Sequence, residues 1–271
     1  MVVLKYGGTS VACCPETMAQ HVKRHVAEGV RPVVVVSALA GVTDLLILPE
    51  TPEARGTFLG IHRRWIKQAQ LPPEMMRGIE HLPWHPSVGE KAASILVAQY
   101  FGRQGIPAKE IWADEDRVVL SSRERVVRVQ LRAVQNCLDR NFVPVVTGFV
   151  SFDVHSQTTA CLGRSGSDVT AAALADALSV PAYIYTDVDG IMSADPGICD
   201  NARTIPVLSR QEAMEMACSG ARVLHPHTLM HDTELIVANT FDEMAPTTRI
   251  LRKDEAAAAP PVQSILCVDR C

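Results

Sequence analysis

The stretch that decides the fold is residues 162–179, LGRSGSDVTAAALADALS, in which a loop of small residues leads into an alanine-rich segment. Alanine and leucine are strong helix formers, and Val180-Pro181 ends the segment, so the pattern predicts a helix over Val169–Leu178 with Ser167 as its N-cap. The loop would then present free backbone N–H groups and the positive end of the helix dipole to an anion. A capped helix whose charges are only solvated stays open as the alternative.

Two charged residues in this stretch are candidates for chemistry. Arg164 carries a planar guanidinium whose donors match a carboxylate or a phosphate. Asp168, in the first turn of the predicted helix, is placed to accept hydrogen bonds or to orient a lysine. One such loop is weak evidence, and the interpretation depends on two further loops of small residues in the chain.

Composition places the chain among globular α/β proteins. Its 271 residues are 47% hydrophobic and 21% charged, enough for one large domain with a full core. With 26 Lys and Arg against 30 Asp and Glu, we expect neither a nucleic-acid partner nor a membrane partner. The N-terminus begins directly with a strand pattern and no apolar run is long enough to span a bilayer, which predicts a cytoplasmic location. None of the eight cysteines forms a C-x-x-C pair, which favours free thiols over disulfides or zinc.

Near the N-terminus, two predicted strands are each followed by a loop of small residues. Val2–Tyr6 is typical of a buried strand, and Gly7-Gly8 follows it, where backbone amides can approach an anion because no Cβ intervenes. Lys5 lies at the end of this strand. Pro32–Val36 is typical of a central parallel strand and ends in the loop 37–43. This order predicts a βαβ unit with both loops at the carboxyl edge of one sheet.

The rest of the chain alternates between helix and strand patterns, which predicts an α/β fold. Helices are expected over Pro15–Glu28, 87–103, Arg123–Arg140 and 209–218, with a helical excursion or a lid over Pro49–Pro86. Strands are expected over Lys109–Ala113, Phe142–Val150, Ala182–Thr186, Leu235–Asn239 and Thr247–Leu251, with a hairpin or a turn over 151–159. Residues 253–271 are rich in alanine and proline and are interpreted as a tail.

Glu90 supports two interpretations. Ser87-Val-Gly-Glu90 fits a capping box, in which the glutamate bonds back to the first N–H of the helix. Alternatively, its carboxylate faces the sheet edge and binds a ligand. The residues alone favour the cap. Asp187 also has two interpretations, because a carboxylate at a strand end suits ribose or a metal but also an ordinary turn.

Seven motifs, taken in order, resemble the catalytic domain of the aspartokinases, in the amino-acid kinase superfamily: KYGGTS, SALAGVTD, Gly89-Glu90, Gly148-Phe149, LGRSGSD, TDVDGI and GARVLHP. The resemblance covers about residues 2–251. It implies a three-layer αβα sandwich around a mainly parallel sheet, as one kinase domain over residues 1–252 with the substrate on its N-terminal half and ATP on its C-terminal half. The implied reaction transfers the γ-phosphoryl group of ATP to the side-chain carboxylate of L-aspartate, as a first step towards lysine, threonine and methionine.

The resemblance also implies a role for each candidate residue. Lys5 would stabilise the transferred phosphoryl group, and Asp168 would orient Lys5. The substrate would be bound by Ser37, Thr43, Glu90, Phe149, Arg164 and Ser167, with Arg164 on its α-carboxylate and Glu90 on its ammonium group. The nucleotide would be bound by Lys5, Gly7, Gly8, Thr186, Asp187, Met192, Arg222 and Val223. Mg²⁺ would be held mainly by the phosphates, without a metal site on the protein.

The chain departs from the family pattern on the nucleotide side. Tyrosine, arginine and lysine are common in the family where Met192, Gly197 and Arg222 stand, so altered nucleotide binding is expected. Two other functions stay open: a kinase of the same superfamily with another amino-acid substrate, and a catalytically silent nucleotide-binding subunit. A homodimer or a separate regulatory chain stays open as a partner.

Ligand-sensing ACT domains usually follow the catalytic domain in this family. Here only residues 252–271 follow the last predicted strand, too few for a domain with its own core. We therefore expect that lysine and threonine do not inhibit this chain on its own, which initial rates with and without each amino acid would test.

Overall fold

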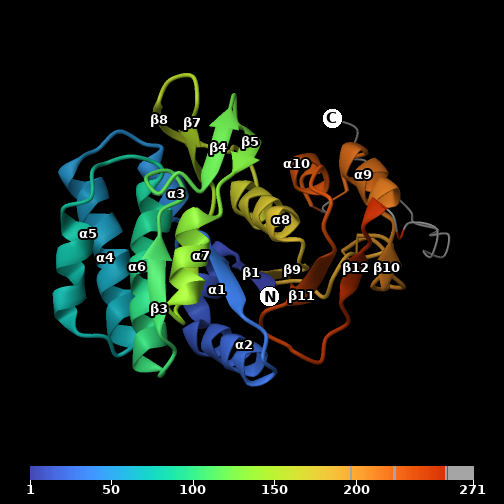
Figure 1. Cartoon of the computed structure of the whole chain (residues 1–271), viewed down its shortest axis with the longest axis horizontal. Coiled ribbons are helices and arrows are strands. Elements are labelled where there is room, and N and C mark those ends of the chain that lie inside the picture. The colour runs from blue at the N-terminus through green and yellow to red at the C-terminus, as the bar shows by residue number, and fades with distance from the viewer. Residues whose placement is uncertain (196, 222–223, 254, 256–271) are drawn as a thin grey trace.

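The computed structural model describes residues 1–195, 197–221, 224–253 and 255. At its centre lies an eight-stranded sheet in the order β10-β12-β11-β9-β1-β2-β6-β3 (Figure 1). Its strands are β1 (Val2–Tyr6), β2 (Pro32–Val36), β3 (Ala108–Ile111), β6 (Val143–Thr147), β9 (Ala182–Thr186), β10 (Val207–Leu208), β11 (Leu235–Asn239) and β12 (Thr248–Ile250). In the part of the chain that the structure describes, every neighbouring pair in this sheet is parallel except β11 and β12. The predicted parallel sheet is confirmed.

Strand β1 is central because it is apolar on both faces. Leu4 and Tyr6 are buried in one hydrophobic core, and Val3 is buried in the other. Successive side chains of a strand point to opposite faces, so Lys5 lies on the same face as Val3. This alternation decides which helix layer the lysine meets.

Helices cover both faces of the large sheet (Figure 1). Side chains from one set of helices join the core of Leu4 and Tyr6: α1 (Gly8–Cys13), α2 (Pro15–Ala27), α3 (Val42–Leu46), α4 (Pro52–Gln68), the 3-10 helix η1 (Pro73–Met76), α5 (Arg77–Glu80) and α6 (Val88–Arg103). Side chains from the other set join the core of Val3: α7 (Arg132–Asp139), α8 (Gly166–Leu178), α9 (Arg210–Cys218) and α10 (Pro226–Leu229). The three-layer sandwich and the helical excursion after residue 49 are therefore confirmed.

A second sheet of four strands lies beside α8, at the top of Figure 1. It contains β4 (Val119–Ser122), β5 (Arg125–Val129), β7 (Val150–Asp153) and β8 (Thr158–Cys161), in the order β5-β4-β7-β8. The chain leaves the large sheet at Gly148-Phe149 and enters the small sheet at Val150. The predicted hairpin over 151–159 is confirmed as β7 and β8, whereas a separate sheet was not predicted.

The predicted helix over Arg123–Arg140 is wrong in its first half. Residues 125–129 instead form β5, which pairs antiparallel with β4. Arg123 and Glu124 both have positive φ, at 48° and 64°, as a tight hairpin turn of this kind requires. The β-branched residues after the turn favour the strand, so a helix forms only from Arg132.

The start of α8 also differs from the prediction. The helix begins at Gly166, and its N-cap is Ser165 in the left-handed region, without a side-chain capping bond. Ser167 is therefore a residue of the first turn and not the N-cap. Ser209, by contrast, is an N-cap with a side-chain bond, and it forms a capping box with both hydrogen bonds to Glu212.

The described residues include six cysteines, all of them free thiols. Over these same ranges, no helix combines the length and the apolar character needed to cross a bilayer.

Candidate active site

Lys5 and Asp168 form an ion pair between the central strand and the first turn of α8. The Lys5 Nζ lies 2.7 Å from the Asp168 Oδ1, and the two side chains are 10% and 13% exposed. Strand alternation directs the lysine towards α8, and the early start of the helix brings the carboxylate to it. The pair is largely buried, and the carboxylate holds the ammonium group of the lysine in place.

The glycine loop after β1 lies directly beside this ammonium group. A Cβ atom added to Gly7 would lie 3.6 Å from the Lys5 Nζ, so the backbone of the loop passes close to the cation. Gly8 has a packing role, because its Cβ would lie 2.6 Å from the Ala38 carbonyl oxygen. The Ala40 N–H donates to the Gly8 carbonyl at 3.2 Å, which joins the first loop to the second.

Glu90 lies in the first turn of α6 and is only 2% exposed. The capping-box interpretation is wrong, because Ser87 has helical dihedral angles and its hydroxyl lies 2.8 Å from the His85 Nδ1 instead. The Ala38 N–H donates to the Glu90 Oε1 at 3.2 Å, which ties the carboxylate to the second loop. The preceding Gly89 permits this contact, since a Cβ there would lie 2.6 Å from the Ala38 Cβ.

The second carboxylate oxygen of Glu90 is buried and has no hydrogen-bond partner among the described residues. Burial raises the pKa of Glu90 to about 8, although the hydrogen bond from Ala38 acts in the opposite direction. A buried carboxylate oxygen without a partner is costly unless a ligand donates to it. An ammonium group has the charge and the donors to do so.

The corner Gly148-Phe149 packs against the first turn of α8. A Cβ on Gly148 would lie 2.6 Å from the Ser167 Oγ, and a Cβ on Gly166 would lie 3.0 Å from the Phe149 Cα. Phe149 itself has a φ of 64°. The structure therefore brings Phe149 and Ser167 together at the end of β6, the strand next to β2.

Arg164 is exposed and makes no hydrogen bond or ion pair to any residue that the structure describes. It stands in the loop before α8, four residues before Asp168. Ser37 and Thr43 are half-buried, at the end of β2 and in α3 respectively. The predicted substrate residues thus come from four segments that end at one edge of the sheet.

The predicted nucleotide residues follow β9, the neighbour of β1. Because Tyr6 pairs with Tyr185, the next residue, Thr186, emerges beside Gly7. The Thr186 hydroxyl donates to the Asp187 Oδ1 at 3.1 Å, and Asp187 is exposed. Met192 lies further along the same loop, where its sulfur accepts a hydrogen bond from Thr204 at 3.5 Å. The predictions for Arg222 and Val223 fall outside the described residues.

Three buried or paired polar residues were not predicted. Asn239 donates to Asp189 at 2.5 Å beside the nucleotide residues, and Lys91 forms an ion pair with Asp114 next to Glu90. The available signal was Lys91 directly before the mostly apolar run 92–98 of α6. Asp114 gave none, because one acidic residue in a predicted loop is ordinary.

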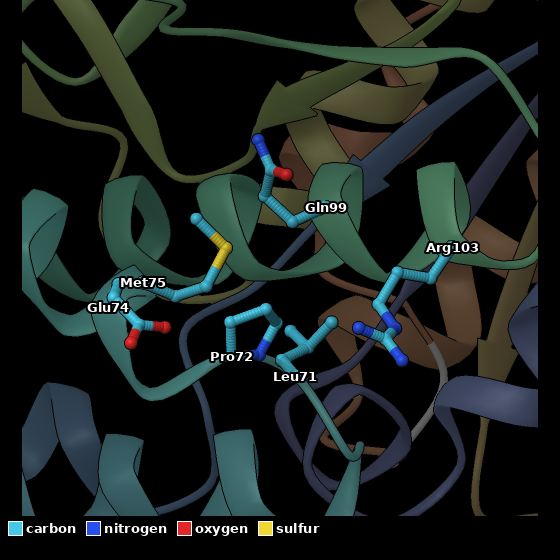
Figure 2. A pocket seen from close by; sticks show the side chains of 6 residues that line it. All are labelled: Leu71, Pro72, Glu74, Met75, Gln99 and Arg103. Atoms are coloured by element: carbon cyan, nitrogen blue, oxygen red, sulfur yellow. The ribbon is translucent and has the colours of Figure 1, made fainter.

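A cavity of about 250 Å³ lies between η1 and α6, where Figure 2 shows its lining side chains. These are Leu71, Pro72, Glu74, Met75, Gln99 and Arg103. Gln99 is nine residues after Glu90, which is about 14 Å along a helix. This cavity is therefore separate from the edge of the sheet where Lys5 and Glu90 lie.

A cation beside backbone amides can stabilise phosphoryl oxygens, and a buried free carboxylate oxygen can bind an ammonium group. Both lie at the carboxyl edge of a parallel sheet, where α/β proteins bind their ligands. The fold and this edge define a kinase-type α/β protein, and the sequence model of the amino acid kinase family matches residues 1–231. The chain belongs to the amino acid kinase family.

Within this family the chain is similar to aspartokinases. It is 32% identical to the aspartokinase of Thermus thermophilus over 237 residues, which cover 85% of this chain and 53% of the relative. It is 30% identical to the aspartate kinase of Pseudomonas putida over 280 residues, which cover 100% of this chain and 63% of the relative. The structure of E. coli aspartokinase III in complex with aspartate and ADP superimposes with a TM-score of 0.71 at 27% identity, over 94% of this chain and 65% of that one. The chain thus spans between half and two thirds of these relatives.

Proposed function

We propose that this chain phosphorylates the side-chain carboxylate of L-aspartate with ATP, giving β-aspartyl phosphate, the first step towards lysine, threonine and methionine. The observation that carries the proposal is the placement of Glu90, buried with one free oxygen, against the second loop, which is hydrogen-bonded to the glycine loop beside Lys5. The similarity to aspartokinases, and the aspartate and ADP in one of their structures, support the choice of substrates.

The phosphoryl transfer needs little acid–base chemistry. A carboxylate oxygen of the substrate attacks the γ-phosphorus, and the bond between that phosphorus and the bridging oxygen of ADP breaks. Since the nucleophile is already ionised, the protein contributes positioning and charge stabilisation. Lys5 stabilises the charge on the transferred group, Gly7 and Gly8 offer backbone N–H donors beside it, and Asp168 orients Lys5.

Substrate selection depends on the α-amino and α-carboxylate groups. Glu90 binds the ammonium group with its free oxygen, and Arg164 binds the α-carboxylate with a guanidinium that has no partner in the described part of the chain. Ser37, Thr43, Phe149 and Ser167 surround the remainder of the substrate. This arrangement favours an α-amino acid over an acceptor that lacks either group.

We place the nucleotide at the end of β9, where Thr186 lies beside the glycine loop and Asp187 and Met192 follow in the next loop. The family resemblance adds Arg222 and Val223 to this set. Mg²⁺ enters with ATP, is held mainly by its phosphates, and supplies neutralisation of phosphate charge.

Hydroxamate formation from ATP with a panel of amino acids tests this proposal. In the presence of hydroxylamine, an acyl phosphate gives a coloured hydroxamate, and we expect a product with L-aspartate but not with succinate, which lacks the ammonium group. A product with a different amino acid would reassign the substrate. ATP binding without any product would instead indicate a silent nucleotide-binding subunit.

A further inference from the structure

Lys91, Asp114 and Thr159 form a buried polar network next to the candidate active site. The Lys91 Nζ lies 2.9 Å from the Asp114 Oδ2, and the Thr159 hydroxyl donates to the same oxygen at 2.6 Å. The side chain of Asp114 is 0% exposed and that of Lys91 is 8% exposed. One carboxylate oxygen therefore joins three segments of the chain.

Each of these segments leads directly to an element of the site. Lys91 follows Glu90 in the first turn of α6. Thr159 lies in β8, which ends at Cys161, and the loop carrying Arg164 starts at the next residue.

Asp114 lies in the loop between β3 and β4, and hydrogen bonds of neighbouring groups hold this loop in place. The adjacent Ala113 N–H donates to the Thr147 hydroxyl at 2.8 Å, at the end of β6. The Lys91 ammonium also bonds Glu115 at 2.7 Å and lies 4.9 Å from the centre of the Trp112 ring. The network thus links the segment carrying Glu90 to the segment carrying Arg164 through an anchored carboxylate.

We propose that this network is a positioning device that sets the spacing between Glu90 and Arg164, the two residues assigned to the α-amino acid. The inference rests on the proposed function for its substrate. Lys91, Asp114 and Thr159 are positioning residues, since they are assigned no contact with the substrate.

The energetics of buried charges support a positioning role over a purely stabilising one. Burying a lysine and an aspartate carries a large desolvation penalty, so such a pair often contributes less stability than apolar side chains of the same volume. A hydrogen bond to a buried carboxylate is directional, whereas apolar packing permits sliding. The network therefore holds β8 at a fixed position relative to the start of α6.

The test replaces Thr159 with valine, which removes the hydroxyl and keeps the shape, and with serine, which keeps the hydroxyl. Thr158→Val is the matched control, because Thr158 is the exposed neighbour in the same strand and bonds Ser156 instead. We expect Thr159→Val to raise the KM for aspartate about tenfold, near the lower end of what one hydrogen bond to a charged group contributes. The KM for ATP should stay unchanged, and Thr159→Ser and Thr158→Val should behave like the wild type.

Amide hydrogen exchange gives a second readout that does not depend on activity. Thr159→Val should speed exchange in residues 162–168, with little change in the melting temperature. Should Thr159→Val fail to fold, Thr159→Ala removes the same hydroxyl and makes the same test.

The outcomes separate the two proposals. A wild-type chain inactive on aspartate contradicts the proposed function, and hydrogen exchange then still decides the positioning role. An active chain with an unchanged aspartate KM and unchanged exchange in Thr159→Val overturns the inference alone. Equal rises in the KM for aspartate and for ATP would also overturn it, since they indicate a general loss of structure.

Discussion

Aspartate binding should release a proton from Glu90. Burial raises the pKa of this carboxyl group to about 8 in the free protein. At pH 7 only about a tenth of the molecules then carry the carboxylate, one pH unit below the pKa. The neutral form cannot pair with the substrate ammonium, so binding at pH 7 should release about 0.9 proton and be about tenfold weaker than above pH 8.

The sign of the pH dependence follows from the direction of the shift. A raised pKa keeps Glu90 protonated below pH 8, so the affinity for aspartate should increase as pH rises from 6 and level off above 8. The neighbouring thiol of Cys161 does not titrate in this range, because burial and the negative charge of Glu90 raise its pKa to about 12.

Glu90→Gln should abolish this pH dependence. Loss of a charge-assisted hydrogen bond costs about 2–3 kcal/mol, or roughly 30- to 150-fold in affinity, above pH 8. At pH 7 the deficit should shrink about tenfold, since most wild-type molecules are then neutral as well. Glu53→Gln, which changes an exposed carboxylate of α4, should bind like the wild type.

Isothermal titration with aspartate, in two buffers of different ionisation enthalpy, counts the protons released. Equal binding heats in the two buffers, together with a flat affinity between pH 6 and 8.5, would show that aspartate binding releases no proton from Glu90.

Three further predictions follow from individual contacts. Arg164→Ala should raise the KM for aspartate about 30- to 150-fold, which corresponds to about 2–3 kcal/mol. The melting temperature should stay unchanged, since Arg164 has no partner among the described residues. Gly148→Ala should lower the free energy of unfolding by about 1–3 kcal/mol in chemical denaturation, because its Cβ would overlap Ser167. Gly102→Ala is the control and should be neutral or stabilising, because the space around its Cβ is open. Burial lowers the pKa of His62 to about 4, so the free energy of unfolding should fall by up to about 3 kcal/mol as pH drops from 6.5 to 4, and His62→Gln should flatten that fall.

The large sheet could be predicted because its strands carry their own signal. Runs such as Pro32–Val36 are apolar on both faces, and only a strand between two helix layers buries both. The hairpin at β5 could not be predicted in the same way. Its arginines and valines fit a helix face as well as an edge strand, and the turn at Arg123 and Glu124 lacks the glycine or asparagine that usually marks it.

The candidate site shows the same division between local and long-range information. The Lys5–Asp168 contact was predicted from the position of Asp168 at a helix start and from the family resemblance, and the structure shows it as an ion pair. The hydrogen bond of the Ser87 hydroxyl could not be predicted. Its spacing from Glu90 fits a capping box, but the hydroxyl is hydrogen-bonded to the neighbouring His85 instead. The bond from Ala38 to Glu90 joins residues 52 positions apart, which no local pattern encodes.

The central claim is that Lys5 acts on the transferred phosphoryl group. Its most direct test is the kcat of Lys5→Met for aspartate phosphorylation, since methionine keeps the packing of the aliphatic stem and removes the charge. Lys23→Met, on the exposed face of α2, is the control. We expect kcat to fall about 100- to 1,000-fold in Lys5→Met, with the melting temperature close to that of the wild type and Lys23→Met fully active. A folded Lys5→Met variant that retains a third or more of the wild-type kcat would contradict the account.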